Sequence, residues 1–169
     1  PADFYFADTV DEIRAMYRRE SDETPHSCMD SRHRFNLEGN VRPVDFYAYC
    51  PNSRGAYIAK GNIVLARTIL WRGQDDKWCY SRIYAGRAAH RETLITHLEE
   101  AGVADIETAH CRVNCSFSIP LGYFNGDKAM PVPYIDSRPF SHVQVKVDDT
   151  HFTVSMGGKR KDSKDGWQF

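Results

Sequence analysis

The chain has 169 residues, a length that fits one domain. Apolar residues make up 41% of it, aromatic residues 12% and charged residues 27%, a globular composition that excludes the disordered and transmembrane classes. Twenty-two basic residues stand against 23 acidic ones, so the net charge of −1 provides no overall positive field to recruit nucleic acid or a membrane. The charge is uneven, because eight acidic residues and three arginines give residues 1–30 a charge of −5, which leaves +4 on the remainder.

A capping box predicts where the first helix begins. Thr9 and Glu12 stand three residues apart, so each side chain can accept a hydrogen bond from a backbone N–H that the helix leaves unpaired. We expect the helix to run to about Arg19, with its core-facing positions at helical spacing, namely Val10, Ile13, Met16 and Tyr17. Residues 20–43 show no periodicity and are predicted to form a long loop, a kind of segment in which functional sites are common.

Four strands are predicted after this loop, because β-branched and aromatic residues dominate segments that turn-forming residues separate. They cover Val44–Cys50, Ala56–Lys60, Ile63–Trp71 and Trp78–Tyr84. Gly61-Asn62 indicates a two-residue hairpin turn, since both residue types tolerate positive φ. The segments together predict an antiparallel meander.

A second helix and further strands complete the predicted domain. The helix covers about Arg87–Ala101 and stops at Gly102, with a core stripe of Leu94, Ile95, Leu98 and Ala101. Later strands are expected at about Arg112–Ile119, Met130–Asp136, His142–Val147 and His151–Met156. The sequence therefore predicts one α+β domain over residues 1–156, with a mainly antiparallel sheet of about seven or eight strands in meanders and two α-helices, followed by a polar tail over 157–169.

Two arginines are predicted to face each other on the sheet. If the turn at Arg72–Lys77 closes symmetrically, Trp71 lies opposite Trp78, and the constant sum of antiparallel partners places Arg67 opposite Arg82. Strand alternation surrounds the pair with apolar and aromatic side chains, those of Ile63, Leu65, Ile69, Trp71, Trp78, Tyr80, Tyr84, Ile58 and Ala48.

Such a pair needs an anion, because opposed like charges cost stability and a buried guanidinium is costly unless its donors are paired. One interpretation is structural, with the fold held by a carboxylate from Asp136, Asp30 or Asp45. The other is an anion site for a phosphate, a nucleotide or a partner's carboxylate, with aromatic side chains available to stack on a ring, namely Trp71, Trp78, Tyr80 and Tyr84. A shifted register is the third alternative.

The five cysteines are Cys28, Cys50, Cys79, Cys111 and Cys115. An odd number, with no apolar signal segment at the N-terminus, favours reduced thiols in a cytoplasm. Cys28 lies between His26 and His33 and is a candidate catalytic nucleophile with a histidine as base, while the alternative is a small buried thiol. Cys111 and Cys115 would lie about 13 Å apart on a strand, too far to share one ion, and are interpreted as core residues.

No metal or cofactor site is predicted. The sequence contains no P-loop, GxGxxG, HExxH, GxSxG or paired-carboxylate motif, which removes the common NTPase, dinucleotide-binding, zincin and α/β-hydrolase interpretations. Lys159-Arg160-Lys161 is short and is diluted by Asp162 and Asp165, so it is interpreted as part of a solvated tail rather than a nucleic-acid site.

Several segments occur in an order that resembles a group of bacteriophage-encoded proteins of uncharacterised function. They are Ser27-Cys28-Met29, Asp45–Ala48, Ala66–Trp71, Arg82-Ile83-Tyr84 and Pro133–Asp136. The group typically shows an SCM segment, an aRalvW strand, an RiY strand, a helix ending in Gly and a late PYlD segment. The resemblance covers roughly residues 27–155, and Thr68-Ile69 and Arg42-Pro43 depart from the group's usual residues.

The resemblance implies a biological context. Small phage proteins outside the virion and replication modules often act on host factors or host defences, as inhibitors that occupy a protein surface or sequester a nucleotide signal. The positions of this chain that match the group's segments are Cys28, Arg67, Trp71, Arg82, Tyr84, Tyr134 and Asp136.

We therefore expect a phage-encoded, non-catalytic binding protein of the host cytoplasm that modulates a host or anti-phage defence protein and does not engage a membrane. The acidic N-terminal region and the aromatic loops are its expected contact surfaces. The alternative is a small enzyme or nucleotide-binding protein that uses Cys28 as nucleophile and Arg67 and Arg82 as an anion site. A structural phage component is a third hypothesis and predicts self-assembly.

Overall fold

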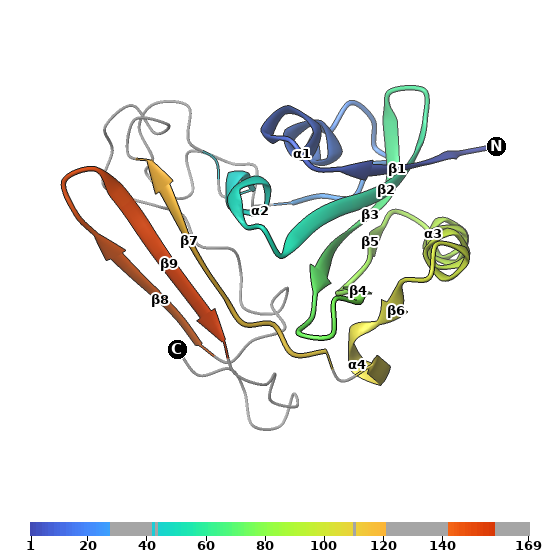
Figure 1. Cartoon of the computed structure of the whole chain (residues 1–169). Helices are drawn as coiled ribbons and strands as arrows, with labels where there is room; N and C mark the ends of the chain where they lie inside the picture. The colour runs from blue at the N-terminus through green and yellow to red at the C-terminus, as the bar shows by residue number, and fades with distance from the viewer. Residues whose placement is uncertain (28–41, 43, 110, 121–141, 158–169) are drawn as a thin grey trace.

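Two sheets of unequal size make up most of the computed structural model, which describes residues 1–27, 42, 44–109, 111–120 and 142–157 (Figure 1). The larger sheet has the order β1-β2-β3-β4-β6, and β5 pairs with β3 beside β4; the smaller sheet has the order β7-β9-β8. All described pairings are antiparallel except that of β4 with β6. The predicted α+β class with a mainly antiparallel sheet is confirmed.

The strands of the larger sheet are β1 (Asp3–Ala7), β2 (Ser53–Lys60), β3 (Ile63–Arg72), β4 (Trp78–Tyr80), β5 (Tyr84–Ala85) and β6 (Ala104–Asp105). Those of the smaller sheet are β7 (Cys115–Pro120), β8 (His142–Val147) and β9 (His151–Gly157). The helices are α1 (Val10–Tyr17), α2 (Asp45–Tyr49), α3 (Ala88–Glu100) and α4 (Ile106–Ala109). The described part of the chain thus adds β1, β6 and two short helices to the predicted elements, while the predicted strand at 130–136 and the tail at 158–169 lie outside the described residues.

The capping box of α1 forms as predicted. The Glu12 amide donates to Thr9 Oγ1 at 3.1 Å, and the Glu12 carboxylate accepts from the amides of Thr9 and Asp8 at 3.4 and 2.8 Å. The helix ends at Tyr17, earlier than expected, because Arg18 adopts an extended conformation with φ −64° and ψ 130°. The capping box fixes where α1 begins, and the helix then buries Ile13, Met16 and Tyr17 on one side.

The predicted strand over Val44–Cys50 is wrong, since Asp45–Tyr49 forms the helix α2. A short apolar run has no periodicity that separates a buried helix turn from a buried strand. The Asp45 carboxylate explains the outcome, because it accepts from the Arg42 amide at 3.0 Å and from Arg14 Nε and Nη2 at 2.8 and 2.7 Å. This bidentate pair attaches the first turn of α2 to α1.

Two positive-φ glycines terminate elements where expected. Gly61 has φ +62° and closes the β2–β3 hairpin, in which Lys60 opposes Ile63. Gly102 has φ +78° just after α3. Of the predicted core stripe of that helix, Leu94 and Leu98 are buried, Ile95 is half-buried and Ala101 is exposed.

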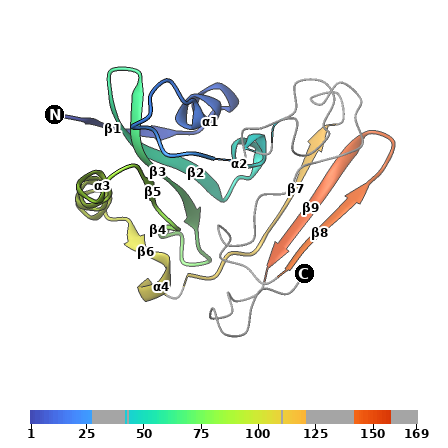
Figure 2. The same ribbon diagram turned by 180° about the vertical axis from the view of Figure 1, so that it is seen from behind.

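Buried side chains cover both faces of β3, the central strand. On one face, α3 supplies Leu94 and Leu98 to a cluster with Leu70. On the other face, α1, α2 and the smaller sheet pack on Trp71, and the cluster reaches Val154 of β9. Figures 1 and 2 show α2 lying between the two sheets and α3 on the far side of the larger one.

In the part of the chain that the structure describes, no helix is both long and apolar enough to cross a lipid bilayer.

The Asp148 carboxylate gives the turn between β8 and β9 a stability that depends on pH. The Asp148 carboxylate accepts from the amides of Thr150 and His151, both at 2.7 Å, and these bonds lower the pKa of Asp148 below its ordinary value. A depressed pKa means that the carboxylate stabilises the turn above its unfolded pKa, about 3.9, and that this contribution is lost as pH falls through the folded pKa. We predict that the Thr150 and His151 amide resonances lose their hydrogen-bonded shifts together on acidification, as followed by NMR.

Asp148→Ala should remove this acid transition in the two amides. Asp149→Ala is the matched control, because Asp149 is its exposed neighbour in the same turn, and it should leave the transition intact. An unchanged titration in Asp148→Ala would assign the shift to another group.

Candidate functional site

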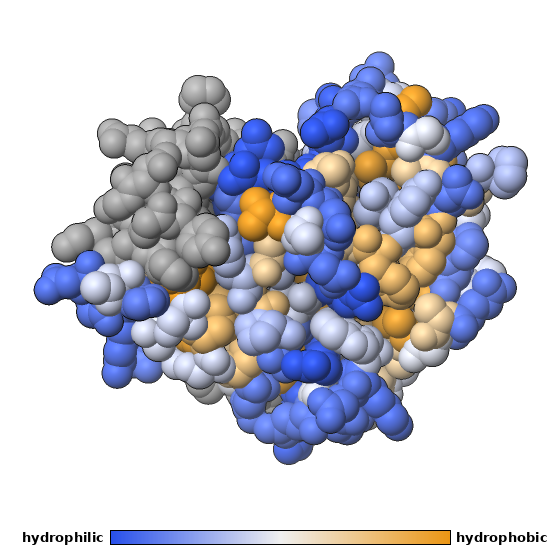
Figure 3. Space-filling view, turned by 45° about the horizontal axis from the view of Figure 1, so that its top comes forward, coloured by the Kyte–Doolittle hydropathy of each residue, from blue (hydrophilic) through white to orange (hydrophobic). Residues whose placement is uncertain are grey.

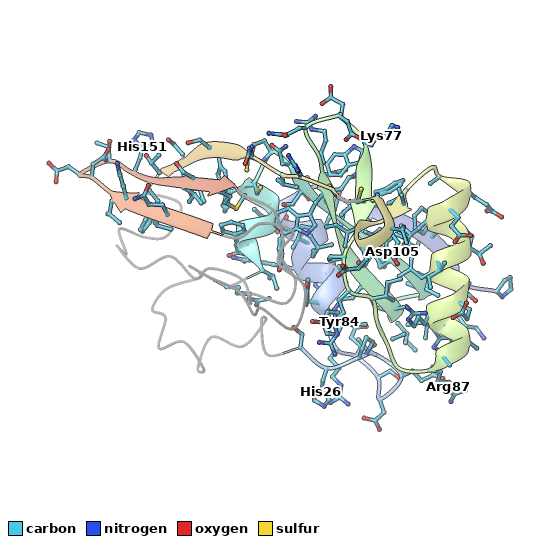
Figure 4. The ribbon with its side chains drawn as sticks, turned by 90° about the horizontal axis from the view of Figure 1, so that it is seen from below. His26, Lys77, Tyr84, Arg87, Asp105 and His151 are labelled. Atoms are coloured by element: carbon cyan, nitrogen blue, oxygen red, sulfur yellow. The ribbon has the colours of Figure 1, made fainter. Side chains whose placement is uncertain are left out.

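Arg67 lies in the middle of β3 and is 1% exposed. Its Nη1 donates to the Pro25 carbonyl at 2.9 Å and its Nη2 to the His26 carbonyl at 3.1 Å. The guanidinium lies 4.5 Å from the ring centroid of Tyr17 and 5.8 Å from that of Tyr84. Figure 4 shows His26 and Tyr84 on the same side of the molecule. Arg67 thus holds the segment before residue 28 against the sheet.

The predicted pairing of Arg67 with Arg82 is wrong, because Arg67 lies opposite Tyr84. The pairing is shifted from the assumed register by one residue at β4, where Trp71 opposes Cys79 and Arg72 opposes Trp78, and by two residues at β5. A one-residue slip moves every side chain of one strand to the other face of the sheet. The shifted register is therefore the alternative that the structure bears out.

Arg82 is exposed and lies in the short connection between β4 and β5. The backbone there turns away from the regular ladder, since the Ser81 hydroxyl donates to the Ile69 carbonyl at 2.8 Å and the Thr68 hydroxyl to the Arg82 carbonyl at 3.1 Å. The Arg82 guanidinium lies 5.1 Å from the ring centroid of Tyr84. Tyr84 thus has a buried arginine and an exposed one near the same ring.

The other aromatic residues that were predicted to share a face with Arg67 lie on two different faces of the sheet. Trp71 is fully buried and packs edge-to-face with Tyr47 at 5.9 Å, so its ring has no surface to offer a ligand. Trp78 and Tyr80 belong to the cluster on the opposite face, beneath α3, together with Ile58, Leu65 and Ile63. Ala48 is part of α2 and not of the sheet.

Several sequence-predicted site residues lie outside the described residues. These are Cys28, Tyr134 and Asp136, and also Asp30 and His33. Asp45, the remaining carboxylate suggested for the arginines, is 2% exposed and pairs with Arg14 of α1.

The four described cysteines form two pairs, and none is in a disulfide. The sulfur atoms of Cys50 and Cys115 lie 3.9 Å apart, and Cys79 and Cys111 line the same hollow, where each thiol shifts the pKa of the other. Cys111 and Cys115, predicted to share one strand face, therefore have different partners. No group of three or more His, Cys, Asp or Glu side chains within the described ranges is placed to hold a metal ion.

Two hollows flank Trp78. One, of about 430 Å³, is lined by Lys77, Cys79, Cys111 and Arg112 among others. The other, of about 310 Å³, is lined by Phe6, Arg54, Lys77 and residues 101–103. A third hollow, of about 420 Å³, holds Arg82 and Arg91 together with Asp105 and Glu107, so its two cations stand beside two carboxylates. That balance offers no excess positive charge to a phosphate.

The largest exposed hydrophobic side chains near a sheet edge belong to β1, which the sequence reasoning missed. Tyr5 is 41% exposed and stacks on Tyr57 of β2 at 5.2 Å. Phe6 is 37% exposed, and the Arg54 guanidinium covers its ring at 4.0 Å. The aromatic run in Asp3–Ala7, just before the capping box, is the sequence feature from which this strand could have been predicted.

Neighbouring contacts hold this edge in place. Arg54 Nη2 donates to Asp8 at 2.8 Å, Phe4 packs edge-to-face with Phe6 at 5.0 Å, and Phe4 stacks on His97 of α3 at 5.2 Å. Strand alternation places Phe4, Phe6 and Arg54 on the face of the sheet that α3 covers, and Tyr5 and Tyr57 on the face that α1 covers. We call these five side chains, on the two faces of one sheet edge, the β1 surface. Figure 3 shows apolar side chains bordered by polar ones on the side of the molecule where Figure 1 places β1 and α3.

No protein-family model matches the chain, and no curated protein matches it. Among solved structures, the crystal structure of an acyl-CoA N-acyltransferase from Pseudomonas aeruginosa is similar at 13% identity, over 94% of this chain and 100% of that chain, with a TM-score of 0.36. A TM-score of 0.36 is too low to carry an argument about function.

Because Arg67 is buried and Arg82 is exposed, replacing each with alanine should change the free energy of unfolding by different amounts. Arg67→Ala leaves two carbonyls without their donors and opens a cavity in the core, so it should lower the free energy of unfolding by about 3–5 kcal/mol. Arg82→Ala removes an exposed side chain and should change the free energy of unfolding by no more than about 0.5 kcal/mol. Urea unfolding of the two variants measures both values, and equal losses would contradict the described environments.

Proposed function

We propose that this protein is a phage-encoded, non-catalytic binding protein of the host cytoplasm that modulates a host or anti-phage defence protein. The phage assignment is supported by the order of the segments that resemble the phage group, from Ser27 to Asp136. The choice of a protein as partner is supported by one structural observation, the exposed and preorganised β1 surface. Arginine and aromatic side chains are the residue types that concentrate binding energy at protein interfaces.

The β1 surface is suited to binding because its side chains are already ordered. Tyr5 is stacked on Tyr57, and Phe6 is held between Phe4 and Arg54. Ordering such side chains costs free energy when it happens on binding, so a surface ordered in advance keeps more of the interaction energy. This favours direct recognition of a partner by β1.

The backbone of β1 indicates what shape the partner has. The strand stands at the end of the larger sheet, and among the described strands it pairs with β2 alone. An edge strand presents N–H and C=O groups to which an extended segment of another protein can add. The exposed carboxylates of Asp3 and Asp11 nearby favour a segment that carries basic side chains.

The alternative, an enzyme or nucleotide-binding protein built on Cys28, Arg67 and Arg82, draws less support from the structure. Arg67 donates to backbone carbonyls inside the protein, and Arg82 stands apart from it on the surface. Cys28 lies outside the described residues.

Photo-cross-linking tests the proposed surface. Benzoylphenylalanine is placed at position 5 or 6, and the full chain is irradiated in extract of the bacterial host. Position 147 is the matched control, because Val147 is 46% exposed and lies on β8 of the other sheet. We expect one protein to be cross-linked from positions 5 and 6 and not from position 147.

The cross-linked protein is then purified and its affinity measured by calorimetry. Tyr5→Ala and Phe6→Ala should each weaken Kd by about tenfold or more, since loss of an interface hot spot costs about 2 kcal/mol. Val147→Ala should leave Kd unchanged, and binding should weaken with added salt because acidic groups contribute. Equal Kd values for all three variants would place the contact elsewhere on the protein.

A further inference from the structure

The first thiol pair is held by rigid neighbours. Cys50 caps the C-terminus of α2, where its amide donates to the Phe46 carbonyl at 3.0 Å. Cys115 begins β7 and is paired with Met156 of β9. The two elements pack together through Phe46 and Phe117, whose rings meet edge-to-face at 5.6 Å. The separation of 3.9 Å between the two sulfur atoms is therefore fixed by the packing of α2 on β7.

The second thiol pair depends on a close backbone approach. Cys79 lies on β4, and Cys111 lies in the connection that leads from α4 to β7. The Gln74 amide donates to the Arg112 carbonyl at 2.9 Å, which holds this connection against the turn after β3. A side chain at Gly73 would begin only 3.1 Å from the Cys111 sulfur, so the absence of a Cβ at this position leaves room for the thiol.

We propose that these four cysteines are a modification site that hydrogen peroxide converts into two disulfides, Cys50–Cys115 and Cys79–Cys111, with Cys28 left as the one free thiol. The proposal goes beyond the proposed binding function and does not depend on it. A disulfide bond is about 2.05 Å long, so the sulfur atoms of Cys50 and Cys115 have to approach by about 2 Å, a distance that side-chain rotation can supply. Five cysteines then divide into two pairs and one remainder.

The chemistry balances with peroxide as the oxidant. A thiolate attacks one peroxide oxygen, the O–O bond breaks, and the departing hydroxide takes a proton to leave as water, which gives a sulfenic acid. The partner thiol loses its proton and attacks that sulfur, the S–O bond breaks, and a second water forms. Each pair loses two electrons and two protons, and the peroxide that it consumes is reduced to two waters.

The environment distinguishes an attacking thiol from a resolving one in each pair. The hydrogen bond from Cys111 lowers the pKa of Cys79 against the effect of burial, and Cys79 lines the 430 Å³ hollow beside Lys77. Burial acts to raise the pKa of Cys50, but hydrogen bonds from Cys115 and from the backbone at Asn52 outweigh it and lower the pKa. Within each pair, the contact between the thiols favours the thiolate form of Cys79 and of Cys50.

Both disulfides would join the larger sheet and its helices to the segment that carries β7. Cys50–Cys115 closes a loop between residues 65 positions apart, and Cys79–Cys111 attaches the preceding connection to β4. Crosslinks of this kind restrict the unfolded chain. Oxidation is therefore expected to raise the midpoint of thermal unfolding and to suppress the separation of the smaller sheet from the larger one.

Thiol counting tests the pairing on the purified full chain. The reduced protein should titrate with five thiols in denaturant, and the protein treated with peroxide while folded, then blocked and denatured, should titrate with one. Cys28→Ser is the matched control and should fall from four thiols to none. A count that stays at five after one equivalent of peroxide per thiol pair, or sulfinic and sulfonic products at Cys50, Cys79, Cys111 or Cys115 in place of lost hydrogens, would overturn the proposal.

Peptide mapping without reduction identifies the bonds. We expect linked peptides for Cys50 with Cys115 and for Cys79 with Cys111, in a chain that remains monomeric on a non-reducing gel. Cys50→Ser should abolish the first linkage and leave the second, and Cys79→Ser should do the reverse. Any linkage that involves Cys28, or links between chains in place of links within one, would contradict the assignment.

Discussion

The buried guanidinium of Arg67 is the interaction on which the surrounding structure depends. A charge in the central strand of a covered sheet is costly unless polar groups meet it, and the two Nη atoms of Arg67 donate to the carbonyls of Pro25 and His26. The rings of Tyr17 and Tyr84 lie beside the guanidinium. These partners come from α1, from the segment that follows it and from β5. One side chain of β3 thus connects β5 to α1 and the segment after it, whose carbonyls lie 42 and 41 positions before Arg67.

The same condition explains which parts of the fold local sequence could predict. The capping box at Thr9, the hairpin at Gly61 and the strand His142–Val147 each rest on residues within a few positions of one another, and each was predicted correctly. The helix α2 was missed because its decisive contact is the pair of Asp45 with Arg14, 31 positions away. The pattern of residues within a few positions of Asp45 cannot predict a partner so far along the chain.

The predicted arginine cluster failed for a related reason. Its register assumed that the turn after Arg72 closes symmetrically. Asp76 adopts φ +61°, and the ladder shifts by one residue at β4, where Trp78 opposes Arg72, and by two residues at β5, where Tyr84 opposes Arg67. Period-two alternation then assigns every residue of β4 to the wrong face. The sequence predicted that a buried Arg67 needs polar partners. It did not predict that these partners are the backbone carbonyls of Pro25 and His26, in the segment after α1.

The spacing of the cysteines in the sequence does not predict which thiols lie close together in the fold. Cys111 and Cys115 are neighbours in sequence, yet they meet Cys79 and Cys50, which lie on different elements. An odd cysteine count favours reduced thiols when it is considered alone. The count becomes informative only once the fold has brought the four described cysteines together in pairs, and sequence spacing alone could not supply that pairing.

The β1 surface and the thiol pairs involve different strands, although Arg54 of the β1 surface also lies 5.7 Å from the ring centroid of Trp78, the residue before Cys79. In the strand order, β2 and β3 separate β1 from β4, which carries Cys79, and the other pair lies where α2 meets β7. Packed strands transmit a change only where they have two arrangements to choose between, and β3 is buried on both faces around Arg67. The proposed disulfides would therefore act on the attachment of the smaller sheet, to which no residue of the β1 surface belongs.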